Sequence, residues 1–342
     1  MMTAPRIGSF PFDDEVLSSW LLRRGGRLRI ERVVFDEALA RQYPEVAAAL
    51  AKDPDFPEGR WWRKVVAGLM AVPVEALDSL GWPSSPWVLL PDCRRSACLL
   101  CLAEAPQVNG QYVREFWLQS WRTLCAVHQV PLVEVPAVGA AWALLSPHRR
   151  RLHGPLMRRP DRAAARLVAD WGRVPAYLRE VIFSAEVQIM EAWREHFVGD
   201  RDGASVSGSL LVWRDVLAFC TSSWAVTASP PIAAQALPWM TGSTYFRCRS
   251  VAPCAEPDLT LRTFRAMVDP AARRICLVAA MDALYGLSGK RIVGLKRQPS
   301  WGWRRVLSCL PFAAWEWLDR QALAWPAGWR PLVGRWRNMV NS

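Results

Sequence analysis

The sequence lacks a long uninterrupted apolar segment. The longest candidate, residues 130–147, is interrupted by Pro131, Glu134 and Pro136. A membrane-spanning helix needs about 20 consecutive, mostly apolar residues, so we predict no association with a membrane. The first residues also lack the apolar core of a secretion signal, because Arg6 is soon followed by Asp13, Asp14 and Glu15. The expected location is therefore the cytoplasm.

Motifs of several enzyme classes are also missing. Residues 286–291 (Gly-Leu-Ser-Gly-Lys-Arg) are too short for a phosphate-binding loop and lack its hydroxyl residue. No G-x-S-x-G nucleophile motif occurs, and the acidic residues are scattered. A Cys–His nucleophile pair stays compatible with the sequence, but the best-placed cysteines and histidine have another use, described below. We therefore predict a protein that is not an enzyme.

Lysine and histidine are scarce, with four residues of each, so 39 of the 43 basic residues are arginine. Residues 1–150 contain 17 basic and 16 acidic residues, whereas residues 151–342 contain 26 and 15. Codon bias in a GC-rich genome explains arginine in place of lysine, but not this one-sided excess over acid. A basic surface is typical of a nucleic-acid partner. We therefore expect DNA binding to involve the second part of the chain.

Within that part, two basic clusters are the candidates for contact with DNA. Each has an alternative interpretation: the first as a solvated linker, the second as a solvated helix face. Trp301 and Trp303 could stack on nucleic acid, although a core position is the favoured interpretation. The candidate residues are Arg149, Arg150, Arg151, Arg158, Arg159, Lys290, Arg291, Lys296, Arg297, Arg304 and Arg305.

The composition, 51% hydrophobic and 22% charged, is typical of a globular chain, and its periodicity predicts a mainly α-helical fold. The first domain, residues 1–148, is predicted to have a helix-turn-helix-like region at 10–80 and a small zinc-ribbon-like knuckle at 93–128. Residues 149–342 are predicted to form a second, basic and Trp-rich helical domain. Ordinary helical packing is the alternative to the helix-turn-helix. Gly25-Gly26 is interpreted as a helix stop, residues 44–59 as a loop and residues 225–238 as a linker.

The cysteines carry the clearest chemical signal. Nine cysteines in a cytoplasmic chain are expected to be reduced. Cys98 and Cys101 form a C-x2-C pair, and after 23 residues Cys125 and His128 form a C-x2-H pair. Each spacing lets two side chains of one turn reach the same ion, and three thiolates with one imidazole suit one structural Zn²⁺. Two chance pairs are the alternative, and Cys93 is an alternative ligand.

Aromatic residues lie between the two pairs. They are Tyr112, Phe116, Trp117 and Trp121. We interpret them as a small apolar core beside the metal, with stacking on bases as the alternative.

At two places the sequence resembles the TniQ/TnsD family of transposition proteins. Pro11, Glu15, Leu17, Ser19-Trp20-Leu21 and Arg23 match its opening motif, P-x-x-x-E-x-L-x-S-W-L-x-R. Cys98, Cys101 and Leu102, then Tyr112, Arg114 and Trp117, then Cys125 and His128 follow the order of its zinc segment. The resemblance covers about residues 8–145. Leu99 and Gln129 replace the usual Pro and Gly, and Val135-Pro136-Ala137-Val138 lacks the thiols of a second zinc site.

This resemblance implies a non-enzymatic adaptor that selects the target of transposition. Such proteins connect a target-recognition device, or target DNA itself, to the AAA+ regulator ATPase that recruits the transposase. Some members read DNA directly, whereas others are held by a CRISPR effector complex, and some of those form dimers. A homodimer is thus one expected state. The alternative function is a zinc-stabilised, sequence-specific DNA-binding regulator.

Overall fold

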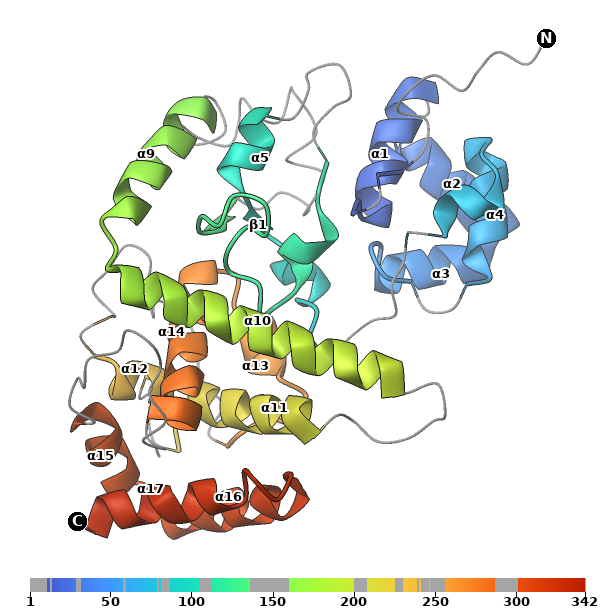
Figure 1. The fold of residues 1–342 in the computed structure, drawn as a ribbon. Helices are drawn as coiled ribbons and strands as arrows, with labels where there is room; N and C mark the ends of the chain where they lie inside the picture. The colour runs from blue at the N-terminus through green and yellow to red at the C-terminus, as the bar shows by residue number, and fades with distance from the viewer. Residues whose placement is uncertain are drawn as a thin grey trace. The chain divides into compact units, whose positions relative to one another are not determined.

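A computed structural model describes residues 11–12, 14–28, 32–57, 60–78, 80, 87–104, 112–135, 160–199, 208–224, 230–238, 240, 246, 256–286 and 301–341. These residues are mainly α-helical, which confirms the predicted fold class (Figure 1). The chain divides into two compact units, Met1–Ala169 and Asp170–Ser342. The boundary predicted after residue 148 lies outside the described residues.

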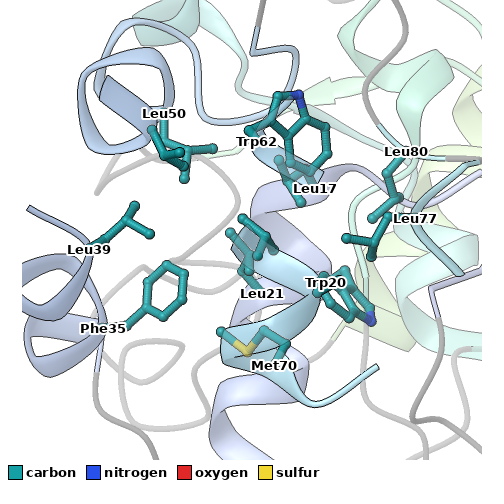
Figure 2. Close-up of a cluster of buried hydrophobic side chains, with 13 residues drawn as sticks. Leu17, Trp20, Leu21, Phe35, Leu39, Leu50, Trp62, Met70, Leu77 and Leu80 are labelled. Atoms are coloured by element: carbon teal, nitrogen blue, oxygen red, sulfur yellow. The ribbon is translucent and has the colours of Figure 1, made fainter. Parts of the chain in front are cut away.

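The N-terminal part of the first unit is a group of short helices around one apolar core. The elements are α1 (Leu17–Leu28), α2 (Arg32–Gln42), α3 (Pro44–Lys52), α4 (Trp62–Met70) and the 3₁₀ turn η1 (Val74–Leu77). Trp20 from α1 and Trp62 from α4 are both fully buried in this core (Figure 2). The other buried members are Leu17, Leu21, Phe35, Leu39, Val46, Leu50, Val66, Ala67, Met70, Leu77 and Leu80. That this region acts as a helix-turn-helix stays a prediction.

Two local predictions in this region are wrong. Helix α1 continues through Gly25-Gly26 to Leu28, although each glycine costs about 1 kcal/mol in a helix. Packing outweighs this cost, because Gly25 is buried and the Arg24 guanidinium donates hydrogen bonds to the carbonyls of Met70 and Ala71. The predicted loop at 44–59 contains α3, since a proline at the first helical position favours a helix start.

The second part of the first unit is built from short elements and a small sheet. They are η2 (Pro91–Cys93), β1 (Ser96–Ala97), α5 (Leu99–Glu104), η3 (Glu115–Leu118), β2 (Val133–Glu134) and most of α9 (Pro160–Gly172), whose last three residues belong to the second unit. Strands β1 and β2 pair antiparallel, with Ser96 opposite Glu134 and Ala97 opposite Val133. This pairing brings residues 36 and 38 positions apart in the sequence into register. The sheet was not predicted, because two-residue strands leave no periodicity to detect.

Within its described residues, the second unit consists of helices joined by irregular segments. It contains α10 (Ala176–Gly199), α11 (Gly208–Thr221), α12 (Ile232–Ala236), α13 (Arg262–Arg265), α14 (Pro270–Met281), the π-helical turn η5 (Asp282–Gly286), α15 (Trp301–Ser308), α16 (Phe312–Ala324) and α17 (Pro331–Asn341). Every residue of α14 is buried, and this helix packs against α10, α11 and α12 (Figure 1). Helix α12 lies within the predicted linker at 225–238, so the linker prediction is wrong for Ile232–Ala236, while residues 225–229 lie outside the described residues.

An aromatic cluster forms the core between α11, α15 and α17. The rings of Phe219, Trp303 and Trp336 stack with centroid separations of 5.9–6.5 Å, and all three side chains are buried. Trp325 is also buried, and its Nε1 donates a hydrogen bond of 2.8 Å to the Asp215 carboxylate. Trp303 is therefore a core residue and is not exposed for stacking on nucleic acid, as the favoured interpretation predicted.

Candidate metal centre

Two short turns place the predicted ligands. Cys98 directly follows β1 and Cys101 lies in the first turn of α5. Cys125 and His128 lie in a tight turn closed by the bridge between Leu124 and Pro131 and by a hydrogen bond of 2.8 Å from Cys125 N to the Val130 carbonyl. The β1–β2 pairing then holds the two turns together. Both pairs thus come from short turns closed by backbone hydrogen bonds, from Leu102 N to the Cys98 carbonyl in the first and from Cys125 N to the Val130 carbonyl in the second.

The turn carrying His128 requires a left-handed residue directly after the histidine. Gln129 has a φ of 52° and donates its backbone N–H to the Cys125 carbonyl at 2.8 Å. Glycine adopts this conformation at little cost, whereas other L-residues pay about 1–2 kcal/mol. Gln129 is the position where the resembled family usually has glycine, so the backbone explains that preference physically.

The four predicted ligands converge on one point. Their ligand atoms all lie within 4.8 Å of one another. His128 Nδ1 is 3.6 Å from Cys98 Sγ, 3.3 Å from Cys101 Sγ and 3.6 Å from Cys125 Sγ. Cys101 Sγ and Cys125 Sγ are 3.6 Å apart. With metal–sulfur bonds of about 2.3 Å and metal–nitrogen bonds of about 2.0 Å, a tetrahedral site has edges of about 3.5–3.8 Å. The cluster can therefore hold a metal ion.

The electrostatics of the cluster are those of groups that compete for protons. Hydrogen bonds with the Cys101 and Cys98 thiols lower the pKa of Cys125, while hydrogen bonds with Cys125 and Cys98, together with burial, raise the pKa of Cys101. Burial acts to lower the pKa of His128, but hydrogen bonds to Cys125 and Glu104 outweigh it and raise that pKa. Bringing three thiols together is unfavourable for forming three thiolates unless a cation is shared among them.

Glu104 is a partner of the cluster that sequence reasoning missed. Its Oε2 lies 2.8 Å from His128 Nε2, the imidazole nitrogen on the far side from the sulfurs. Glu104 is three residues after Cys101 in α5, so both side chains lie on one face of the helix. That spacing, C-x2-C-x2-E, is the signal that could have found it.

The opening motif is joined to the segment between the two metal-binding pairs. The buried Glu15 carboxylate accepts hydrogen bonds from Ser19 Oγ at 3.0 Å and from the Arg23 guanidinium at 2.5 Å. Ser19 Oγ in turn accepts one from the Val113 backbone N–H at 3.0 Å. Arg114 forms an ion pair of 2.6 Å with Asp14. Glu15, Ser19 and Arg23 of the motif thus form one internal network.

A second polar joint connects the loop after α3 to the residues just before β1. The buried Arg94 guanidinium contacts the carboxylates of Asp53 at 2.5 Å and Asp55 at 2.8 Å, and its Nε donates to the Leu89 carbonyl. Asp55 also accepts a hydrogen bond from Ser18 of α1. Burial acts to raise the pKa of Asp53, but the hydrogen bond from Arg94 outweighs it, and that pKa is lowered. This joint was not predicted, because its members are far apart in sequence.

The other candidates near the centre have separate outcomes. Trp117 and Trp121 are buried, as the core interpretation predicted, whereas Tyr112 and Phe116 are partly exposed. The Tyr112 ring stacks on Phe12 at 4.5 Å between centroids. Cys93 is partly exposed and is not a member of the four-residue cluster.

Most of the basic DNA-contact candidates lie outside the described residues. These are Arg149, Arg150, Arg151, Arg158, Arg159, Lys290, Arg291, Lys296 and Arg297. Arg304 and Arg305 are described: both are exposed on α15, beside the buried Trp303 and Val306. Their exposure is compatible with DNA contact and equally with a solvated helix face.

Comparison with known proteins gives no relative. No protein-family model, curated protein or solved structure matches this chain. Membership of the TniQ/TnsD family therefore stays a prediction from the motifs. Among the described helices, none combines the length and apolar character needed to cross a bilayer.

Proposed function

We propose that Cys98, Cys101, Cys125 and His128 hold one structural Zn²⁺. Three soft thiolates and one imidazole are the donor set that zinc accepts in tetrahedral structural sites. Four of the six separations between the ligand atoms, at 3.3–3.6 Å, are close to the edges of such a tetrahedron. Four protein ligands complete the coordination, so no position is left for a water or substrate, and a structural role follows.

We further propose that the protein is a non-enzymatic adaptor that selects the target of transposition. The observation that carries this proposal is that the two motifs of the family resemblance meet in one structure. Ser19 of the opening motif accepts a hydrogen bond from Val113, and Asp14 pairs with Arg114, in the segment between the metal-binding pairs. The two chain segments that carry the separate signals of the resemblance thus contact each other.

The proposed partners follow from this adaptor role. On one side is the AAA+ regulator ATPase, and on the other is target DNA or a CRISPR effector complex, bound by a monomer or a homodimer. The first 150 residues are nearly neutral and suit protein contacts, whereas the net charge of residues 151–342 is about +11 and suits DNA. The exposed Arg304 and Arg305 are the described candidates for the DNA side.

A paired binding experiment tests the adaptor. The purified full chain is used to pull down an AAA+ regulator ATPase, and random duplex DNA is titrated by fluorescence anisotropy at two salt concentrations. We expect ATPase capture and weak DNA binding that falls steeply with salt, because each neutralised phosphate adds about 0.9 to the slope. The double variant Arg304→Ala/Arg305→Ala should reduce that slope, while the matched control Arg173→Ala, which removes an exposed arginine elsewhere, should not.

The alternative function, a zinc-stabilised DNA-binding regulator, predicts the opposite pattern. Tight binding to one DNA sequence without ATPase capture would overturn the adaptor and favour the regulator. The basic second part of the chain is the observation that favours this alternative.

A further inference from the structure

The imidazole of His128 is held from both sides. Its Nδ1 lies 3.3–3.6 Å from the three cysteine sulfurs, while its Nε2 lies 2.8 Å from Glu104 Oε2. A neutral imidazole has one N–H donor and one lone-pair acceptor, and the partner of one nitrogen determines the role of the other. A carboxylate can only accept, so the contact with Glu104 requires the proton on Nε2. The lone pair is then on Nδ1, facing the sulfurs.

Helix α5 supplies both a ligand and this partner. Cys101 reaches the centre from the first turn of α5, and Glu104, one turn later, reaches around to the opposite edge of the His128 ring. Side chains from one turn of α5 therefore contact both ring nitrogens of the imidazole, although His128 itself belongs to the other turn of the cluster.

We propose that Glu104 is a positioning residue that fixes the Nε2-protonated tautomer of His128 and so presents Nδ1 to the metal. The inference rests on the proposed metal centre and adds one residue to it. Carboxylate partners of metal-bound histidines typically contribute 10–100-fold to metal affinity. Because the Glu104 side chain is 62% exposed and the contact is screened by water, we expect the lower end of that range, about tenfold.

The variants Glu104→Gln and Glu104→Ala separate positioning from charge. The glutamine carbonyl can still accept the Nε2 proton, whereas alanine cannot. Positioning predicts that Glu104→Ala loses about tenfold in Zn²⁺ affinity and Glu104→Gln only two- to threefold. A purely electrostatic effect would weaken both variants equally. Glu191→Gln, which removes an exposed helical carboxylate from the second unit, is the control and should bind like the wild type.

The measurements are Zn²⁺ competition against a chelator, the Co²⁺ absorption spectrum and the imidazole ¹⁵N–¹H correlation spectrum of the full chain. In the wild type, we expect a protonated Nε2 and a metal-bound Nδ1. In Glu104→Ala, the thiolate-to-Co²⁺ charge-transfer bands should keep their intensity while the Nε2 proton exchanges faster. Preserved sulfur bands also show that the variant still folds around the ion.

Three outcomes would overturn the inference. Metal bound at Nε2 would contradict the tautomer, and equal affinities for the wild type and both Glu104 variants would contradict the role of Glu104. Equal losses in both variants would leave charge alone as the cause. If the wild type bound neither Zn²⁺ nor Co²⁺, the metal centre itself would fail, which is a distinguishable result.

Discussion

Each of the two units of this protein is stabilised internally by a different kind of interaction. In the first unit, segments distant in sequence are joined by buried polar networks around Glu15 and Arg94 and by the four-residue metal cluster. In the second unit, the fully buried helix α14 and the stack of Phe219, Trp303 and Trp336 dominate. That unit also buries charge, as at Asp215.

The difference follows from the lengths of the elements. The second unit contains a 24-residue helix and a 14-residue helix, which can bury continuous apolar faces. The metal-binding part of the first unit has two-residue strands and a six-residue helix. Elements this short bury little surface each, and small folds of this kind usually need a metal or covalent links. Perturbations should therefore affect the two units differently.

Removing the metal should have the largest effect. Structural zinc contributes about 10–16 kcal/mol to the folding of small zinc peptides, so a strong chelator or Cys101→Ser should unfold the knuckle. Because Arg94, Val113 and Arg114 connect it to α1 and the loop after α3, the N-terminal helices should lose protection with it. Hydrogen exchange on the full chain measures this loss of protection separately in each unit.

The matched control for that experiment is Cys309→Ser, because Cys309 is an exposed free cysteine of the second unit. It should leave exchange unchanged throughout. Loss of protection in α10, α11 and α14 on chelation would break the proposed contrast between the units.

Breaking the Arg94 joint should have the next largest effect. Arg94→Leu leaves Asp53 and Asp55 without their buried cation, which typically costs about 3–5 kcal/mol. Asp53 has a lowered pKa in the folded state, so its contribution is present above the usual carboxyl range and is lost as the pH falls through the lowered value. The free energy of unfolding that Arg94→Leu loses relative to the wild type, measured by urea unfolding, should therefore be largest near neutral pH and should become smaller in acid. A deficit that does not change with pH would contradict this account.

Tight helix packing in the second unit is tested at a glycine. A Cβ at Gly302 of α15 would lie 1.9 Å from the backbone carbonyl oxygen of Ala236 in α12. Backbone atoms cannot move aside easily, so Gly302→Ala should cost about 3 kcal/mol. Gly334→Ala is the matched control, because a Cβ there meets open space and alanine favours the helix by about 0.5–1 kcal/mol. The midpoint temperature of thermal unfolding should fall for Gly302→Ala and rise for Gly334→Ala.

The smallest effect is expected at Glu115, and it depends on pH. Burial and the nearby Asp14 carboxylate raise the pKa of Glu115 from its usual 4.5 to about 7. The folded state thus binds the proton more tightly, and stability falls as the pH rises from about 4.5 to about 7. Glu115→Gln should be more stable than the wild type by about 1–3 kcal/mol at pH 8 and equal to it at pH 4. The control Glu75→Gln, at an exposed position, should show no such trend. A stability difference between Glu115→Gln and the wild type that is the same at pH 4 and pH 8 would refute the raised pKa of Glu115.

Sequence patterns by themselves identified the four residues of the Cys/His cluster and the helical class. The C-x2-C and C-x2-H spacings are local, because each pair reaches one ion from a single turn, so all four residues could be named without a structure. Long amphipathic segments such as α10 also repeat their apolar residues often enough to be detected. These features are readable because the information lies within a few consecutive residues.

The tertiary structure decided what depends on residues far apart in the sequence. Gly25-Gly26 stays helical only because α1 is packed and its Arg24 binds the end of α4. Ser19 and Arg94 became parts of polar joints only through partners tens of residues away. Glu104 could be placed opposite the sulfurs only once the β1–β2 pairing had brought His128 to α5. In each case, the free energy comes from contacts that exist only after the chain has folded.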